Sequence, residues 1–138
     1  MSNLFLDDIR KPLDVTHAWH NSGWEEFPLY SWDIVRSYDE FVDYIIKNGL
    51  PSRISFDHDL SWEHYPQDEL RMGGPIDYSK FKEKTGLDAA KWLVEYCDSK
   101  NLPLPEWFVH SSNPVGRMNI VNYLRSYELF KQSCFLNR

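Results

Sequence analysis

Cysteine is scarce in this sequence of 138 residues, which contains only Cys97 and Cys134. Two cysteines cannot form the disulfide framework of a small secreted domain, and their wide separation excludes a CxxC metal or redox pair. Because disulfides are rare in reducing compartments, we expect a cytoplasmic protein. Cys97 falls on the apolar face of an expected helix, which indicates a small core residue rather than a nucleophile.

Long apolar runs are also missing, since no stretch approaches the ~20 consecutive apolar residues of a membrane-spanning helix. The first residues, MSNLFLDDIRK, turn acidic after a short apolar run, which is not typical of a secretion signal. We therefore expect neither membrane insertion nor export.

Positive charge is in the minority, with 15 Lys and Arg against 21 Asp and Glu, for a net charge of −6. Loose binding to a long nucleic-acid duplex depends on many basic side chains, so we exclude that class of partner. A small anionic ligand stays compatible with the sequence if a metal ion or a local cluster of donors offsets the negative field.

Repeats, low-complexity tracts and Ser/Gly linkers are absent as well, so we expect one domain over residues 1–138. Aromatic residues, by contrast, are abundant at 16% of the chain. Large rings pack protein cores and also stack on nucleobases, and both roles stay open here. Trp19 and Trp24 are the candidates for stacking.

Four short runs are typical of buried β-strands, and segments of helical period lie between and after them. The expected strands are residues 3–6, 32–36, 53–56 and 107–110. The expected helices are residues 39–48, a segment that begins at Thr85 and a segment that begins at Asn113-Pro114. Thr85 and Asp88 have the spacing of a capping box, and proline is favoured at the first position of a helix.

Strands that alternate with helices imply parallel pairing, right-handed crossovers and an α/β sandwich. Residues 11–31 and 61–84 are longer than ordinary connections in such folds. We expect them to form a lid or walls over the strand ends, with a disordered loop as the alternative for the second segment.

Polar residues follow three of the expected strands, and the carboxyl ends of parallel strands meet at one edge of a sheet. Clustered carboxylates repel one another unless a cation compensates, and oxygen-rich sites favour Mg²⁺ or Mn²⁺. We therefore predict a divalent metal site made by the acidic residues at this edge, Asp7, Asp8, Asp57 and Asp59. The alternative is that these acids only begin loops and cap helices.

The start of the third helix predicts a phosphate site, because free N–H groups and the helix dipole attract anions there. Ser111, Ser112 and Asn113 add side-chain donors, and Gly116 would let a phosphate approach closely. A plain N-cap without a ligand is the alternative. Arg10 either binds the phosphate or pairs with the carboxylates.

Histidine supplies proton-transfer chemistry near neutral pH, and His58 and His110 both lie at strand ends. A structural role is the alternative for each. His17, His20 and His64 lie in the irregular segments, where we expect no role beyond substrate contact.

The arrangement resembles a response-regulator receiver domain, which has an acidic pair after strand one, an aspartate after strand three and a Ser or Thr after strand four. Here these are Asp7 and Asp8, Asp57, and Ser111. More closely, four runs resemble the family described as cyclic-phosphate processing receiver domains. They are LDDIRKP (6–12), FDHDL (56–60), TGLDAAKWL (85–93) and VHSSNPVGRMNI (109–120).

This resemblance implies a receiver-like, flavodoxin-like three-layer α/β fold with a short, mostly parallel central sheet. It suggests the strand order 2-1-3-4 and allows a short fifth strand. It also implies an activity on cyclic phosphates of nucleotides or RNA ends, in bacteria or their phages and often in conflict systems, so a viral chain would act in the host cytoplasm. No lysine follows a clear fifth strand, which disfavours phosphorelay signalling.

We therefore expect a metal-dependent phosphoesterase that hydrolyses a cyclic phosphate in a nucleotide or at an RNA terminus. Asp57, His58 and His110 are its expected catalytic residues, with a histidine moving protons and Asp57 holding the ion or attacking directly. Two alternatives stay open. One is a binding protein that captures a cyclic nucleotide without turnover, and the other is a receiver-like module that regulates a partner.

Overall fold

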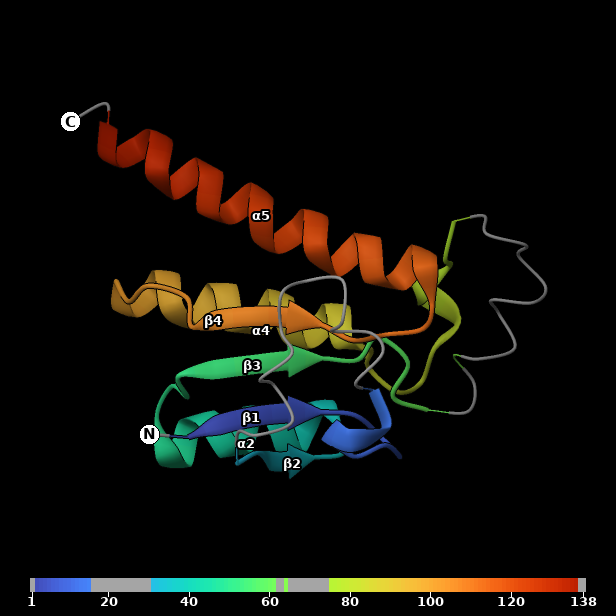
Figure 1. Cartoon of the computed structure of the whole chain (residues 1–138). Helices are drawn as coiled ribbons and strands as arrows, with labels where there is room; N and C mark the ends of the chain where they lie inside the picture. The colour runs from blue at the N-terminus through green and yellow to red at the C-terminus, as the bar shows by residue number, and fades with distance from the viewer. Residues whose placement is uncertain (1, 16–30, 62–63, 65–74, 137–138) are drawn as a thin grey trace.

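A parallel sheet of four strands forms the centre of the molecule, with the order β2-β1-β3-β4 (Figure 1). The computed structural model describes residues 2–15, 31–61, 64 and 75–136. The strands are β1 (Asn3–Leu6), β2 (Asp33–Val35), β3 (Arg53–Phe56) and β4 (Glu106–Val109). All pairings are parallel, so the expected α/β receiver-like fold and its strand order are confirmed.

Side chains alternate between the two faces of the sheet. Leu4, Leu6 and Ile54 belong to the main core, together with residues of the helices. Phe5 points to the opposite face and is also fully buried. Both faces of the sheet therefore exclude solvent at its centre.

Two strands have slightly different limits from those expected. β2 is shorter at both ends, without Trp32 and Arg36, and β4 is shifted by one residue toward the N-terminus. Arg53 pairs with Glu106 in the register of β3 and β4, and an ion pair of 3.1 Å joins their side chains. The shift leaves His110 immediately after β4 rather than inside it.

The helices begin where the sequence predicts, within one residue. In α2 (Tyr38–Asn48) the Ser37 hydroxyl accepts a hydrogen bond from the amide of Glu40, and Gly49 ends the helix at φ 83°. In α4 (Gly86–Lys100) the amide of Thr85 donates to Asp88 Oδ2 over 2.8 Å, so the predicted capping box is confirmed.

The last helix, α5 (Pro114–Leu136), has 23 residues and is the longest element of the described chain. Figure 1 shows α5 passing beyond β4, so its last turns lie away from the sheet. Leu129 and Phe130 are more than half exposed there.

The two cysteines have opposite environments. Cys97 is fully buried in the core, and burial raises the pKa of its thiol to about 11, so the predicted core role is confirmed. Cys134, near the end of α5, is exposed. None of the helices in the described segments is long and apolar enough to cross a lipid bilayer.

The structure describes only parts of the two long connections. These parts include the 3₁₀ helices η1 (Pro12–Val15) and η5 (Tyr78–Lys80). Trp19, Trp24, His17 and His20 lie outside the described residues. The lid over the strand ends stays a prediction.

Candidate functional site at the carboxyl edge of the sheet

The residues that follow β1, β3 and β4 lie side by side. The amides of Asp7, Asp57 and His110 each donate to a carbonyl of a neighbouring strand, at distances of 2.9–3.1 Å. This continuation of the strand ladder fixes the three residues in adjacent positions. One potential ligand atom from each lies within 4.8 Å of the other two, and all three side chains are buried.

Asp7 is held by four hydrogen bonds. Its Oδ1 accepts from the amides of Ile9 (3.0 Å) and Arg10 (2.8 Å), and its Oδ2 accepts from Arg10 Nε (2.9 Å) and His110 Nε2 (3.0 Å). Burial alone raises the pKa of a carboxyl group. These bonds outweigh it and hold the pKa of Asp7 well below its ordinary value, so Asp7 is ionised.

The two carboxylate oxygens of Asp57 differ in their hydrogen bonding. Its Oδ1 accepts from the amide of His58 (2.9 Å) and pairs with Arg10 Nη2 (3.1 Å). Its buried Oδ2 has no hydrogen-bond partner within the described part of the chain. Burial raises the pKa of Asp57 well above its ordinary value, and the negative charge of Asp7 raises it further, although Arg10 opposes the shift. A buried carboxylate oxygen in this state favours a proton or a cation beside it.

Arg10 bridges the two carboxylates from the turn after β1, and about a quarter of its side chain is exposed. A second arginine supports this turn. Arg36 follows β2, and its Nη1 donates to the carbonyl oxygens of Asp7 (3.2 Å) and Arg10 (2.8 Å).

His110 is buried in contact with Phe5, Ser55 and Asp7. Its ring stacks on Phe5 with centroids 4.3 Å apart, and its Nδ1 lies 2.7 Å from the Ser55 hydroxyl. Because Asp7 is ionised and only accepts, Nε2 of His110 carries the proton between them. Burial lowers the pKa of His110, against the opposing effect of Asp7. A neutral His110 that orients Asp7 follows from these contacts.

His58 points away from Asp57 and into a second buried network. Its Nδ1 lies 2.7 Å from Asp59 Oδ1, and its Nε2 lies 2.8 Å from the Tyr78 hydroxyl, which also accepts from Asn119 Nδ2 (2.9 Å). Asn113 Nδ2 donates to the same Asp59 oxygen (3.1 Å). His58 therefore connects the end of β3 with η5 and α5.

Two glycines let this network form. A Cβ at Gly116 would lie 2.4 Å from the His58 ring, and a Cβ at Gly86 would lie 1.7 Å from the carbonyl oxygen of Asp57. The Gly116 amide donates to Asn113 Oδ1 (3.0 Å), as expected for an N-cap. Close packing against His58 thus explains why position 116 is a glycine, and contact of Gly116 with phosphate stays a prediction.

The predicted site residues divide into two groups. Asp7, Asp57, Arg10 and His110 form one connected cluster. Half-buried Asp8 lies near enough for its charge to raise the pKa of Asp57. A second group lies around His58 and the start of α5, and consists of His58, Asp59, Ser111, Ser112, Asn113 and Gly116.

Members of the second group differ in exposure. The buried Ser111 hydroxyl accepts from the amide of Asn113 (3.1 Å), whereas Ser112 is exposed. Burial raises the pKa of Asp59, but hydrogen bonds from His58 and Asn113 outweigh burial and lower it below its ordinary value. Metal binding by Asp59 and phosphate binding by the two serines stay predictions.

His64 has a structural role in the described part of its segment. Its Nδ1 accepts from the amide of Leu60 (2.8 Å), and its Nε2 lies 3.1 Å from the carbonyl oxygen of Glu83. Because Nδ1 accepts from an amide, Nε2 must carry the proton and donate to Glu83.

Sequence reasoning missed four residues that support the site: Ser55, Arg36, Tyr78 and Asn119. Ser55 carries a usable signal, because a serine inside a buried strand requires a hydrogen-bond partner. The other three lie in ordinary surroundings in the sequence, and only the fold brings them to the strand ends.

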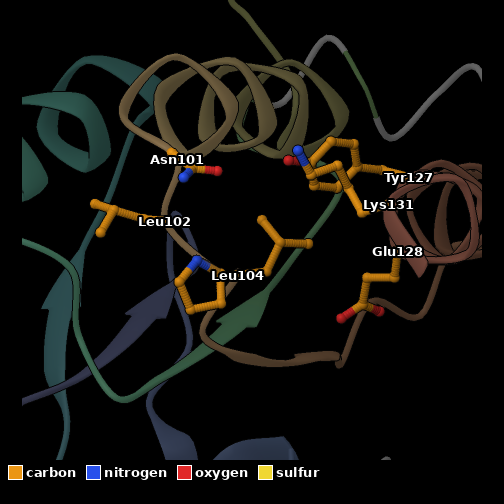
Figure 2. A pocket seen from close by; sticks show the side chains of 7 residues that line it. Asn101, Leu102, Leu104, Tyr127, Glu128 and Lys131 are labelled. Carbon is orange, nitrogen blue, oxygen red and sulfur yellow. The ribbon is translucent and has the colours of Figure 1, made fainter. Parts of the chain in front are cut away.

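A separate pocket of about 420 Å³ lies near the amino end of β4, between the end of α4 and the second half of α5 (Figure 2). Its charged groups already have partners, since Glu128 accepts from Trp107 Nε1 (3.0 Å) and Lys131 pairs with Asp98 (3.3 Å). The pocket contains none of the predicted site residues.

Comparison with protein families gives a match over most of the chain. The family model described as "Cyclic-phosphate processing Receiver domain" matches residues 2–126. No curated protein and no solved structure matches the chain. The matched range contains both groups of site residues.

Proposed function

The chain belongs to the cyclic-phosphate processing receiver domain family, and on that premise we propose that it is a metal-dependent phosphoesterase. Its substrate is a cyclic phosphodiester in a nucleotide or at an RNA terminus. One observation carries the proposal: Asp57 presents a buried carboxylate oxygen that has no hydrogen-bond partner among the described residues, in a cluster whose potential ligand atoms lie within 4.8 Å of one another.

The donor set fits a hard divalent cation. Asp57 and Asp7 contribute buried carboxylates, and Asp8 lies beside them. Oxygen donors of this kind select Mg²⁺ or Mn²⁺, so we assign the ion to these three residues. When bound, the ion would supply charge neutralisation on the non-bridging phosphate oxygens.

The remaining polar groups suit the binding of a phosphate. Arg10 is partly exposed and contacts both carboxylates, so a phosphate beside Asp57 would lie within its reach. Exposed Ser112 and the start of α5 follow β4, which lies on the other side of β3 from β1 and the Arg10 turn. His110 holds Asp7 in place, and His58 holds the start of α5 through Asp59.

The decisive assay is turnover by the purified protein with Mg²⁺ or Mn²⁺ and a panel of 2′,3′-cyclic and 3′,5′-cyclic nucleotides, followed by chromatography. Asp57→Asn should lose at least ~10²-fold, because the ion supplies several kcal/mol of transition-state stabilisation. Asp43→Asn is the matched control, since it makes the same change at an exposed position of α2. Equal turnover by wild type and Asp57→Asn would remove the proposed site.

One observation favours capture without turnover as a second candidate function. His58 and His110 are buried, and both ring nitrogens of each are engaged by protein groups. General acid or base catalysis needs a group within reach of the substrate. Recovery of intact nucleotide from the denatured complex would favour capture, whereas an opened product would exclude it.

A further inference from the structure

The guanidinium of Arg10 lies between two buried carboxylates. Its Nε lies 2.9 Å from Asp7 Oδ2 and its Nη2 lies 3.1 Å from Asp57 Oδ1. The carboxylate side chains are 0% and 2% exposed, whereas the arginine side chain is 26% exposed. A planar guanidinium suits such a bridge because its N–H groups form a rigid fork.

One guanidinium does not balance this cluster. When Asp57 is ionised, the two carboxylates carry two negative charges against a single positive charge, and Asp57 Oδ2 receives no hydrogen bond from the described residues. A divalent cation matches both charges and would use the orphan oxygen. Arg10 and the ion would then repel each other within a few ångströms, so they compete for the same carboxylates.

We infer that Arg10 serves as the counter-ion of Asp57 in the cation-free protein. A divalent cation displaces its guanidinium from Asp57, and the released guanidinium then binds the phosphate of the substrate. This inference rests on the proposed function, because it needs a cation at the same carboxylates. It adds the order of binding: the cation binds first, and this frees Arg10 to bind the phosphate.

The surrounding contacts allow the side chain of Arg10 to move while its backbone stays. The Arg10 amide donates to Asp7 Oδ1 (2.8 Å), and its carbonyl accepts from Arg36 Nη1 (2.8 Å). Both bonds hold the main chain of the turn. The guanidinium, in contrast, is about a quarter exposed and borders solvent, and leaving Asp57 breaks its ion pair with that carboxylate.

Coupling between the two ligands follows from this exchange. If the cation increases the affinity for phosphate, phosphate must increase the affinity for the cation by the same factor. The cation-free protein should therefore bind inorganic phosphate weakly, because its guanidinium is occupied by Asp7 and Asp57.

The direct test observes the arginine Nε–H resonances of ¹⁵N-labelled protein by NMR during a Mg²⁺ titration. The signal that disappears in Arg10→Lys belongs to Arg10. We expect this signal to move toward the position of exposed arginines as Mg²⁺ saturates. A signal that stays in place while other site resonances saturate overturns the inference, and so does the absence of any Mg²⁺-dependent change.

A second test measures Mg²⁺ binding by calorimetry with and without inorganic phosphate. Arg10→Gln should bind Mg²⁺ about tenfold more tightly than wild type, because no counter-ion has to leave, and phosphate should strengthen its Mg²⁺ binding less. The matched control is Arg53→Gln, which removes an arginine paired with Glu106 at the opposite end of β3. Mg²⁺ affinity in Arg10→Gln that does not exceed wild type and the control contradicts the inference.

These readouts separate the inference from the proposed function. Displacement of Arg10 by Mg²⁺ without turnover of any cyclic nucleotide would remove the hydrolytic proposal and keep the exchange. Turnover that depends on Mg²⁺ while the Arg10 signal stays in place would keep hydrolysis and remove the exchange.

Discussion

Asp57 is buried in surroundings that favour its protonated form. Its folded pKa is raised, so the folded state holds this proton more tightly than the unfolded state does. The folding stability that protonated Asp57 contributes is therefore present at low pH. It is lost as the pH rises from the ordinary pKa of 3.8 through the raised pKa of the folded state. The sign is opposite to that of Asp7, whose lowered pKa adds stability above the unfolded value and withdraws it in acid.

Asp57→Asn should accordingly stabilise the metal-free protein at neutral pH. We expect a gain of about 1 kcal/mol, the scale of relieving one poorly satisfied buried polar group, or about 3 °C in melting temperature. Thermal melts in EDTA between pH 4 and 8 test this, and the variant should show less loss of stability with rising pH. Parallel curves for wild type and Asp57→Asn would contradict the assignment, and Asp43→Asn should follow wild type.

Gly116 lies against the ring of His58, and both ring nitrogens are engaged, so the ring cannot yield. Gly116→Ala should therefore cost about 1–3 kcal/mol, although the same exchange inside an exposed helix gains up to ~1 kcal/mol. Urea denaturation measures the difference.

The double variant provides the control for this contact. In a His58→Ala background the alanine at position 116 has room, so its cost should vanish and the two changes should not add. An unchanged cost of Gly116→Ala in that background would show that the contact with His58 is not the cause.

At the level of elements, the start of α4 approaches β3 very closely. The Gly86 amide donates to the carbonyl of His58 (2.8 Å), and a Cβ at Gly86 would collide with the carbonyl of Asp57. The backbone carbonyl of Asp57 cannot rotate away from an added Cβ as a flexible side chain could. Gly86→Ala should therefore cost more than ~3 kcal/mol, above the usual range for overpacking.

Thr85→Ala is the matched control for Gly86→Ala. It weakens the cap of the same helix without placing an atom on β3, and should cost only about 1 kcal/mol. Denaturation curves of both variants test the difference, and equal costs would mean that the close approach to Asp57 is unimportant for stability.

The elements themselves are readable from local patterns. Short β-branched and apolar runs predict the strands, and Thr85 and Pro114 mark helix starts because their chemistry acts within one turn. The meeting of Asp7 with Asp57 follows from parallel pairing alone. The sequence therefore predicts the sheet edge and its acidic cluster.

The orientation of each polar side chain is a different matter. His58 could face Asp57 or α5, and it faces α5 because Asp59, Tyr78 and Asn119 receive it there. Those partners lie up to 61 residues away in the sequence, and no periodicity connects them. Likewise, only the fold shows that Arg10 bridges both carboxylates.

At the level of the whole molecule, a bound cation should raise stability, because it binds the folded state alone. At 100 times its dissociation constant a ligand adds ~2.7 kcal/mol. Mg²⁺ or Mn²⁺ should therefore raise the melting temperature of wild type by several degrees, and EDTA should reverse the shift. The gain should be absent in Asp57→Asn, and an equal gain in that variant would locate the ion elsewhere.

The contrast between the two thiols has a practical consequence. Cys97 is inaccessible and poorly ionised, so a maleimide dye would attach selectively to exposed Cys134. The 23 residues of α5 span ~34 Å and join that position to the turn packed on His58. A single fluorophore on the unmutated protein would thus lie near the C-terminal end of α5, whose N-terminal end packs beside the carboxyl ends of the strands. Its anisotropy would report a ligand-driven tilt of the helix.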